Sequence, residues 1–165
     1  MLSYMENSFM DHALKEARDA AARGEVPVGA VLTNSEDQVL AASGNRTEEL
    51  QDPTAHAEML VIRDAVGKLQ DRRLIGCSLY VTLEPCAMCA QAISLSRIKR
   101  LYFGATDEKS GAVEHGVRLY TDPSCHHKPE VYGGLNASTA RSLLREFFLL
   151  RRQYVDKNYN EIKLR

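Results

Sequence analysis

The chain has 165 residues, with 21 Lys and Arg residues against 22 Asp and Glu residues, so its formal net charge is −1. This length suits one compact domain with a sizeable core, and we expect residues 1–165 to form a single domain. A composition of 44% hydrophobic and 26% charged residues excludes a disordered chain, a collagen-like fibre and a disulfide-dense miniprotein. The balanced charge argues against a protein that binds nucleic acid by bulk electrostatics.

The sequence predicts a cytoplasmic protein without a membrane partner. No apolar run approaches the roughly 18–20 residues that a membrane-spanning helix needs, and the N-terminus lacks the pattern of a signal peptide. In the cytoplasm its four cysteines are expected to be reduced thiols. They are Cys77, Cys86, Cys89 and Cys125.

The N-terminal part predicts a helix followed by a β-hairpin. Ser8 suits the N-cap of the helix, and Gly24 suits its end. Residues 28–32 and 39–43 are expected to be paired strands, because the polar turn 34–37 separates two apolar runs. The small residues at the start of the first strand indicate either close backbone packing or room for a ligand.

The middle of the chain predicts a helix and then a βαβ unit. After the polar loop 44–53, a largely buried helix is expected over 55–69. A strand over 78–83, a short helix over 86–95 and a strand over 98–104 follow with short connections. The two strands are therefore expected to be parallel.

The C-terminal part predicts a loop-rich segment over 105–135 and a helix from Ser138 to at least Tyr154. The fold class is α/β, with a mixed sheet, an antiparallel hairpin at one side and helices on both faces. The segment 137–165 carries seven basic and three acidic residues, a net charge of +4, which leaves −5 for the rest of the chain. Within this basic helix we expect Phe147 and Phe148 to pack in the core.

His56-Ala57-Glu58 and Pro85-Cys86-Ala87-Met88-Cys89 carry the chemistry. Positions i and i+3 share a helix face, so both thiolates can reach one ion. One imidazole nitrogen and two sulfurs suit Zn²⁺. Three protein ligands with an open position form a catalytic site, in which the Glu58 carboxylate can take a proton from water and give it to a leaving group.

Alternatives remain at this point. Glu58 could complement a helix dipole, and His56 could be a core histidine. Cys77 or Cys125 could supply a fourth ligand and close the site into a structural one. Cys125-His126-His127 could be a second metal cluster, although a loop with polar contacts to substrate or backbone is the favoured interpretation.

The pattern His-x-Glu followed by Pro-Cys-x-x-Cys resembles that of the zinc-dependent nucleoside and nucleobase deaminases. Over roughly residues 8–153 the chain resembles the bacterial tRNA-specific adenosine deaminases, in segments 25–31, 44–46, 79–86 and 104–112. Asp52 to Glu58 is also similar to bacterial guanine deaminases and so indicates the superfamily only. Residues 125–127 and 154–165 match the family pattern less well.

The resemblance implies a three-layer α/β/α sandwich with a mixed central sheet, as in cytidine deaminases, and a homodimer. It also implies hydrolytic removal of the 6-amino group from the wobble adenosine of a tRNA anticodon stem-loop. One zinc ion per chain would be held by His56, Cys86 and Cys89, and Glu58 would move protons. The residues implied in substrate binding are Asn45, Val28, Ala30, Asp107, Lys109, Arg151 and Arg152.

Two other functions stay open from the sequence. One is deamination of a free nucleobase or nucleoside of the guanine or cytosine type. The other is a non-catalytic, zinc-stabilised RNA-binding subunit, which the presence of Glu58 disfavours.

Overall fold

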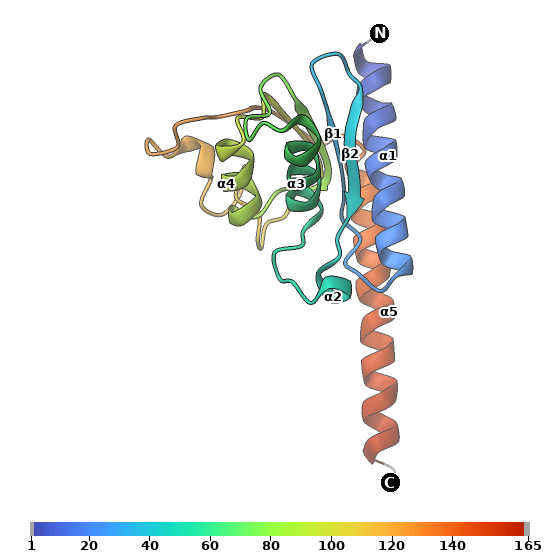
Figure 1. The fold of residues 1–165 in the computed structure, drawn as a ribbon. Coiled ribbons are helices and arrows are strands. Elements are labelled where there is room, and N and C mark those ends of the chain that lie inside the picture. Colours follow the sequence, from blue (N-terminus) through green and yellow to red (C-terminus); the bar gives the residue numbers. More distant parts are fainter. Residues whose placement is uncertain (1, 164–165) are drawn as a thin grey trace.

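A five-stranded mixed sheet forms the centre of the molecule, with helices on both sides (Figure 1). The computed structural model describes residues 2–163, and the side chains of residues 8–154. The strands are β1 (Gly29–Thr33), β2 (Val39–Gly44), β3 (Ser78–Leu83), β4 (Arg100–Ala105) and β5 (Glu130–Gly133). The helices are α1 (Leu2–Ala22), α2 (Thr47–Leu50), α3 (Ala57–Leu69), α4 (Ala87–Leu95) and α5 (Ala137–Lys163), with a 3₁₀ turn at Leu119–Thr121.

The strand order is β2-β1-β3-β4-β5. Strand β1 pairs antiparallel with both β2 and β3, whereas β4 pairs parallel with both β3 and β5. The predicted hairpin and the βαβ unit of β3, α4 and β4 are therefore confirmed. Because α4 starts at the carboxyl end of β3, residues 84–89 lie at one edge of the sheet, where α3 also begins.

The sheet separates two buried clusters, since alternate residues of a strand point to opposite faces. On one face, Val31 and Tyr80 pack with Met10 and Leu14 of α1. On the other face, Leu79 packs in a larger cluster with residues of α3 and α4. This arrangement is the expected three-layer α/β/α sandwich.

Close packing of α1 on the hairpin explains the small residue at the start of β1. A Cβ atom at Gly29 would overlap the carbonyl oxygen of Ala13 and come within 2.5 Å of the Ala17 nitrogen. At this position the structure supports close backbone packing, one of the two explanations that the sequence left open.

Three secondary-structure elements differ from the expectations. Helix α1 begins at Leu2, so Ser8 lies inside the helix and is not its N-cap. Helix α2 forms within the expected loop 44–53, and β5 forms within the expected loop-rich segment. Strand β5 is an edge strand that, within residues 2–163, pairs with β4 alone. Most of its residues are exposed, so it lacks an alternating apolar pattern.

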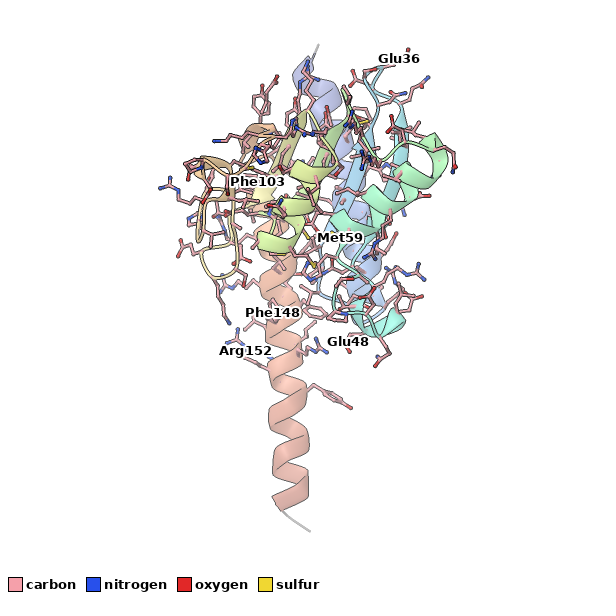
Figure 2. The ribbon with its side chains drawn as sticks, turned by 60° about the vertical axis from the view of Figure 1, so that its left-hand side comes forward. Glu36, Glu48, Met59, Phe103, Phe148 and Arg152 are labelled. Carbon is pink, nitrogen blue, oxygen red and sulfur yellow. The ribbon has the colours of Figure 1, made fainter. Side chains whose placement is uncertain are left out.

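Helix α5 runs well beyond the sheet, as Figures 1 and 2 show. The expectation that Phe147 and Phe148 pack in the core is wrong, because the helix has left the sheet where they occur. Phe148 is 43% exposed and makes an edge-to-face contact with the partly exposed Phe147. Among the described residues, no helix has the length and apolar character needed to cross a membrane.

Candidate metal centre and substrate cavity

Two helix N-termini bring three metal-ligating side chains together. His56 is the N-cap residue of α3, Cys86 is that of α4, and Cys89 lies in the first turn of α4. The Nδ1 atom of His56 lies 3.7 Å from the Cys86 Sγ and 3.6 Å from the Cys89 Sγ. All three ligand atoms lie within 4.8 Å of one another, so one ion can contact all of them.

The chemistry of this group suits one zinc ion, which prefers nitrogen and sulfur ligands. A hydrogen bond from Cys89 and the neighbouring His56 lower the pKa of Cys86 to about 4, against the opposing effect of burial. The hydrogen bond with Cys86 raises the pKa of His56. A thiolate thus forms readily at the α4 N-terminus, and thiolates are the form of cysteine that binds metals.

The other two cysteines lie outside this group. Cys77 is 3% exposed in the core, where burial raises the pKa of its thiol. The Cys125 Sγ lies 3.2 Å from the carbonyl oxygen of His127 and 3.5 Å from the Ser94 hydroxyl. His127 Nε2 in turn lies 2.7 Å from the Ile98 carbonyl oxygen, so this loop makes the polar backbone contacts that the favoured interpretation predicted.

Glu58 lies in the first turn of α3 and is only 4% exposed. Burial is the main cause that raises the pKa of its carboxyl group to about 7, and the nearby His56 opposes this shift. A carboxyl group with a pKa near neutral pH can both take up and release a proton there. Its position beside His56 and Cys86 is the position that a proton carrier needs.

A cavity of about 210 Å³ lies beside the metal-ligating group. Of the residues implied in substrate binding, Val28, Asn45 and Asp107 line it, whereas Ala30 is fully buried in the core cluster. The other lining residues did not stand out from the sequence, because their residue types are common and they come from four separate segments. They are Val26, Thr47, Leu83, Glu84 and Ser110.

A groove of about 800 Å³ between the loop 106–110 and α5 adjoins the cavity. Asp107 and Ser110 line both hollows, and Lys109 and Arg141 line the groove. Phe148 lines the groove as well, from the part of α5 that extends beyond the sheet (Figure 2). A substrate larger than a base can therefore lie along this surface while one of its groups enters the cavity.

Arg151 and Arg152 lie on α5 just beyond the groove, and both are exposed. The Arg151 guanidinium lies 5.5 Å from the centre of the Phe147 ring, a cation–π contact. Arg152 Nε donates a long hydrogen bond of 3.3 Å to the Phe148 carbonyl oxygen. The side chains of residues 155–165, which include further basic residues of the predicted basic helix, lie outside the described part of the chain.

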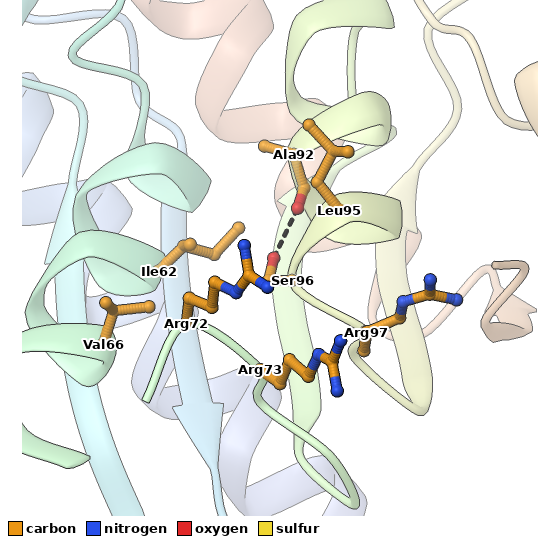
Figure 3. Close-up of a pocket in the computed structure, with 8 residues that line it drawn as sticks. All are labelled: Ile62, Val66, Arg72, Arg73, Ala92, Leu95, Ser96 and Arg97. Atoms are coloured by element: carbon orange, nitrogen blue, oxygen red, sulfur yellow. Dashed lines mark hydrogen bonds between the residues drawn. The ribbon is translucent and has the colours of Figure 1, made fainter. Parts of the chain in front are cut away.

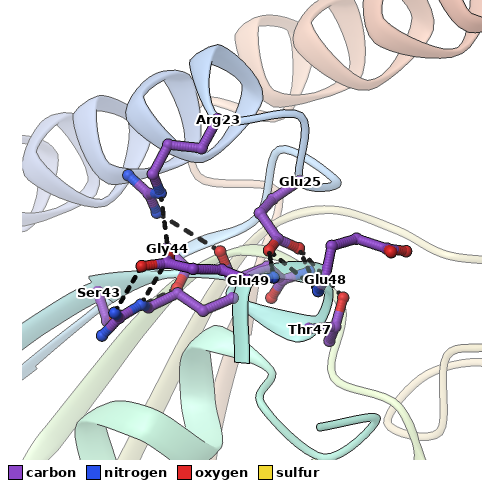
Figure 4. A network of polar contacts seen from close by, with 9 residues as sticks. Arg23, Glu25, Ser43, Gly44, Thr47, Glu48 and Glu49 are labelled. Carbon is purple, nitrogen blue, oxygen red and sulfur yellow. Dashed lines mark hydrogen bonds and ion pairs between the residues drawn. The ribbon is translucent and has the colours of Figure 1, made fainter. Parts of the chain in front are cut away.

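A buried carboxylate fixes the short helix that supports one side of the cavity. Glu25 is 1% exposed and accepts hydrogen bonds from the Glu48 and Glu49 backbone nitrogens at 3.0 and 2.9 Å, and from the Thr47 hydroxyl at 3.1 Å (Figure 4). Burial by itself raises the pKa of Glu25, but these hydrogen bonds outweigh it and lower the pKa. The ionised Glu25 thus holds Thr47 at the cavity.

Comparison with known proteins agrees with this site. The family model for the cytidine and deoxycytidylate deaminase zinc-binding region matches residues 3–105, which include the three ligands and Glu58. A tRNA-specific adenosine deaminase of Agrobacterium fabrum is 59% identical over 140 residues, 85% of this chain and 91% of the relative. One from Bacillus subtilis is 43% identical over 140 residues, 85% of this chain and 86% of the relative.

Solved structures give the same result. A structure described in a study of A-to-I editing by tRNA:A34 deaminases superposes with a TM-score of 0.81 at 58% identity, covering 83% of this chain and 99% of that one. A guanine deaminase from Nitrosomonas europaea gives a TM-score of 0.69 at 26% identity, covering 86% and 83% of the chains. The fold and site define a zinc-dependent deaminase, and within that class the chain belongs to the tRNA-specific adenosine deaminases.

Proposed function

We propose that this protein converts adenosine to inosine by hydrolytic deamination at the wobble position of a tRNA anticodon. The observation that carries the proposal is the small cavity beside His56, Cys86 and the buried Glu58, which adjoins a larger groove toward α5. The cavity suits one base, and the groove suits the nucleotides on either side of it. A target base must be turned out of its stack to enter such a pocket.

In this proposal His56, Cys86 and Cys89 hold one zinc ion per chain, which when bound supplies the Lewis acidity that activates water at neutral pH. Glu58 takes a proton from water and returns it to the ring nitrogen and the departing amine. Val28 and Asn45 contact the inserted base from the cavity wall, and Ala30 shapes that wall from beneath.

The RNA backbone is proposed to lie along the groove. Asp107 and Lys109 contact the anticodon from the loop 106–110, and Arg151 and Arg152 contact phosphates from α5. This binding is local, because the chain as a whole carries a net charge of −1. The relatives' activity on tRNA also supports a cytoplasmic location for one deaminase domain over residues 1–165.

We also propose a homodimer. A hollow of about 440 Å³ beside α3 and α4 is lined by four apolar residues and four polar ones (Figure 3). The apolar residues are Ile62, Val66, Ala92 and Leu95, and the polar ones are Arg72, Arg73, Ser96 and Arg97. Leu95 is 70% exposed in the single chain, and a second copy would cover it. Light scattering coupled to size-exclusion chromatography measures the mass directly, and a monomer at all concentrations contradicts this assembly.

Treatment of an anticodon stem-loop that carries adenosine at the wobble position tests the activity. Mass analysis of the nucleosides should show inosine at that position only, and a hairpin with adenosine elsewhere in the loop serves as the control. Free guanine, cytosine and adenosine are assayed in parallel for ammonia release. Turnover of a free base with an inert stem-loop would overturn the proposal in favour of a nucleobase deaminase, to which the similarity to guanine deaminases points.

A further inference from the structure

Glu84 is a buried carboxylate that gathers an unusual number of donors. Its side chain is fully buried, and Oε1 accepts hydrogen bonds from the backbone nitrogens of Val113, Glu114 and His115 at 3.2, 2.8 and 2.9 Å. Its Oε2 accepts another from the Asp107 backbone nitrogen at 2.9 Å. His115 Nδ1 lies 2.8 Å from the same oxygen, so five N–H groups converge on one carboxylate.

All five donors belong to the loop 107–115, which forms one wall of the catalytic cavity. Asp107 and Ser110 of this loop line the cavity, and Lys109 lines the groove beside it. Asp107 Oδ1 in turn accepts hydrogen bonds from the backbone nitrogens of Lys109 and Ser110, both at 3.0 Å. Glu84 therefore holds the first residue of a short turn that presents the substrate-facing side chains.

The loop is also joined to the metal-binding segment beside Glu84. The Ala112 nitrogen donates to the Pro85 carbonyl oxygen at 2.9 Å, and Cys86 forms an isolated β-bridge with Gly111. The packing at Gly111 is so close that a Cβ atom there would lie 2.7 Å from Glu84 Oε1. The carboxylate and the adjacent backbone thus fix the distance between the metal ligands and the loop.

We infer that Glu84 is a positioning residue that holds the substrate-contacting loop 107–115 in register with the metal-binding segment. The substrate named in this inference rests on the proposed function, whereas the hydrogen bonds that hold the loop do not depend on it. An ionised carboxylate satisfies four backbone donors and one ring donor, whereas an uncharged amide places its own NH₂ group among N–H donors. Loss of the charge therefore releases the loop while the side chains of His56, Glu58, Cys86 and Cys89 stay unchanged.

The test is Glu84→Gln, with kcat and KM measured separately on the wobble-adenosine stem-loop. The variant should raise KM about tenfold, because the loop loses hydrogen bonds to a charged group. The loop then becomes ordered only when the substrate binds. The kcat value stays within about threefold, and zinc content stays at one per chain. A fall in kcat together with loss of zinc, at unchanged KM, would overturn the inference, since Glu84 would then support the metal site instead.

Amide hydrogen exchange supplies a readout that does not depend on activity. In Glu84→Gln, peptides covering 107–115 should exchange at least about tenfold faster, while peptides covering α3 keep their protection. Unchanged exchange in the loop overturns the positioning role whatever the substrate is. Failure of the parent protein to act on the stem-loop, combined with the faster loop exchange, overturns the proposed substrate and leaves the positioning role standing.

His115→Ala is the second variant, in case Glu84→Gln does not fold. This variant removes the ring donor, which is one of the five donors to Glu84. The His115 side chain is 33% exposed, so the fold should tolerate its removal. The KM value should rise by about threefold, in the same direction as for Glu84→Gln.

Glu114→Ala is the matched control, because its exposed side chain is removed while its backbone donor to Glu84 remains. A rise in KM for the control equal to that for His115→Ala would contradict the inference.

Discussion

Asn45 Oδ1 accepts a hydrogen bond from the backbone nitrogen of Ala57 at 2.9 Å. Ala57 is the first residue of α3 and lies between His56, the proposed metal ligand, and Glu58, the proposed proton carrier. The Asn45 side chain therefore satisfies one of the free N–H groups at the start of this helix, although it lies 12 residues away. Asn45 also lines the cavity, where its Nδ2 group can donate a hydrogen bond to a ligand.

Two substitutions separate these roles of Asn45. Asn45→Ala removes the cap on α3 and should lower the free energy of unfolding by about 1 kcal/mol, with a large loss of deamination. Asn45→Asp keeps an oxygen acceptor for Ala57 but removes the donor Nδ2. Its unfolding free energy should stay near that of the parent, while KM for the stem-loop rises. Equal activity of Asn45→Asp and the parent protein would show that only the cap matters.

Glu58→Gln should abolish turnover while zinc remains bound. The amide has nearly the shape of the carboxyl group but cannot carry a proton between water and the leaving amine, a role worth about 10²- to 10⁴-fold in rate. Single-turnover deamination of the stem-loop measures the rate, and elemental analysis measures the zinc. Glu36→Gln, in an exposed turn, is the control. Loss of zinc from Glu58→Gln would contradict the assigned role.

The metal set predicts a sharp contrast among the cysteines. Cys89→Ser should lose zinc and activity together, because it removes one of three ligands. Cys77→Ala should keep one zinc per chain and near-normal kcat, since the buried Cys77 lies in the core and outside the ligand group. Zinc content by elemental analysis decides the outcome. A Cys77→Ala protein without zinc would show that Cys77 is a metal ligand.

Much of this centre could be predicted from the sequence because its spacing is local. Cys86 and Cys89 are one helical turn apart, and His56 and Glu58 begin a helix that a strongly apolar pattern marks. The parts that could not be predicted depend on distant partners. Helix α2 is four residues long and is capped by the Glu25 carboxylate more than twenty residues earlier.

The aromatic residues of α5 show a second limit. Apolar side chains at helical spacing predict a buried face, but they do not show how far the sheet extends beside the helix. Phe147 and Phe148 occur where α5 has passed the sheet, and so they border the groove or solvent instead of the core. A periodic apolar pattern predicts that a helix forms, whereas the burial of its apolar face depends on which element packs against it.

The stability of the fold should depend on pH through Glu25. Its pKa is lowered in the folded protein, so the stability it contributes is present above the ordinary value of 4.5 and is lost as the pH falls through the lower folded value. Glu25→Gln should lower the free energy of unfolding by about 1–3 kcal/mol at pH 7. Urea denaturation at pH 7 and at pH 3.5 measures this difference, which should be smaller at pH 3.5. An equal difference at both pH values would contradict the role of the ionised form.

The basic end of α5 predicts a salt-dependent contribution to RNA binding. Replacing both Arg151 and Arg152 by Gln should weaken binding of the stem-loop and reduce the slope of log K against log salt by about 1–2. Fluorescence anisotropy at several salt concentrations measures this slope. Arg18→Gln on the exposed side of α1 should leave it unchanged. An unchanged slope in the double variant would remove these arginines from the RNA interface.

The extension of α5 beyond the sheet places its basic side chains at fixed distances from the groove. Arg141 lines the groove and Arg152 lies eleven residues further along the same rigid helix, a distance of about 16 Å at the ordinary helical rise. A free base that fills the cavity leaves this whole length unused. In the proposed function, a folded RNA loop whose backbone spans this length would contact α5 at a fixed separation from the inserted base, which would favour the RNA over a free base.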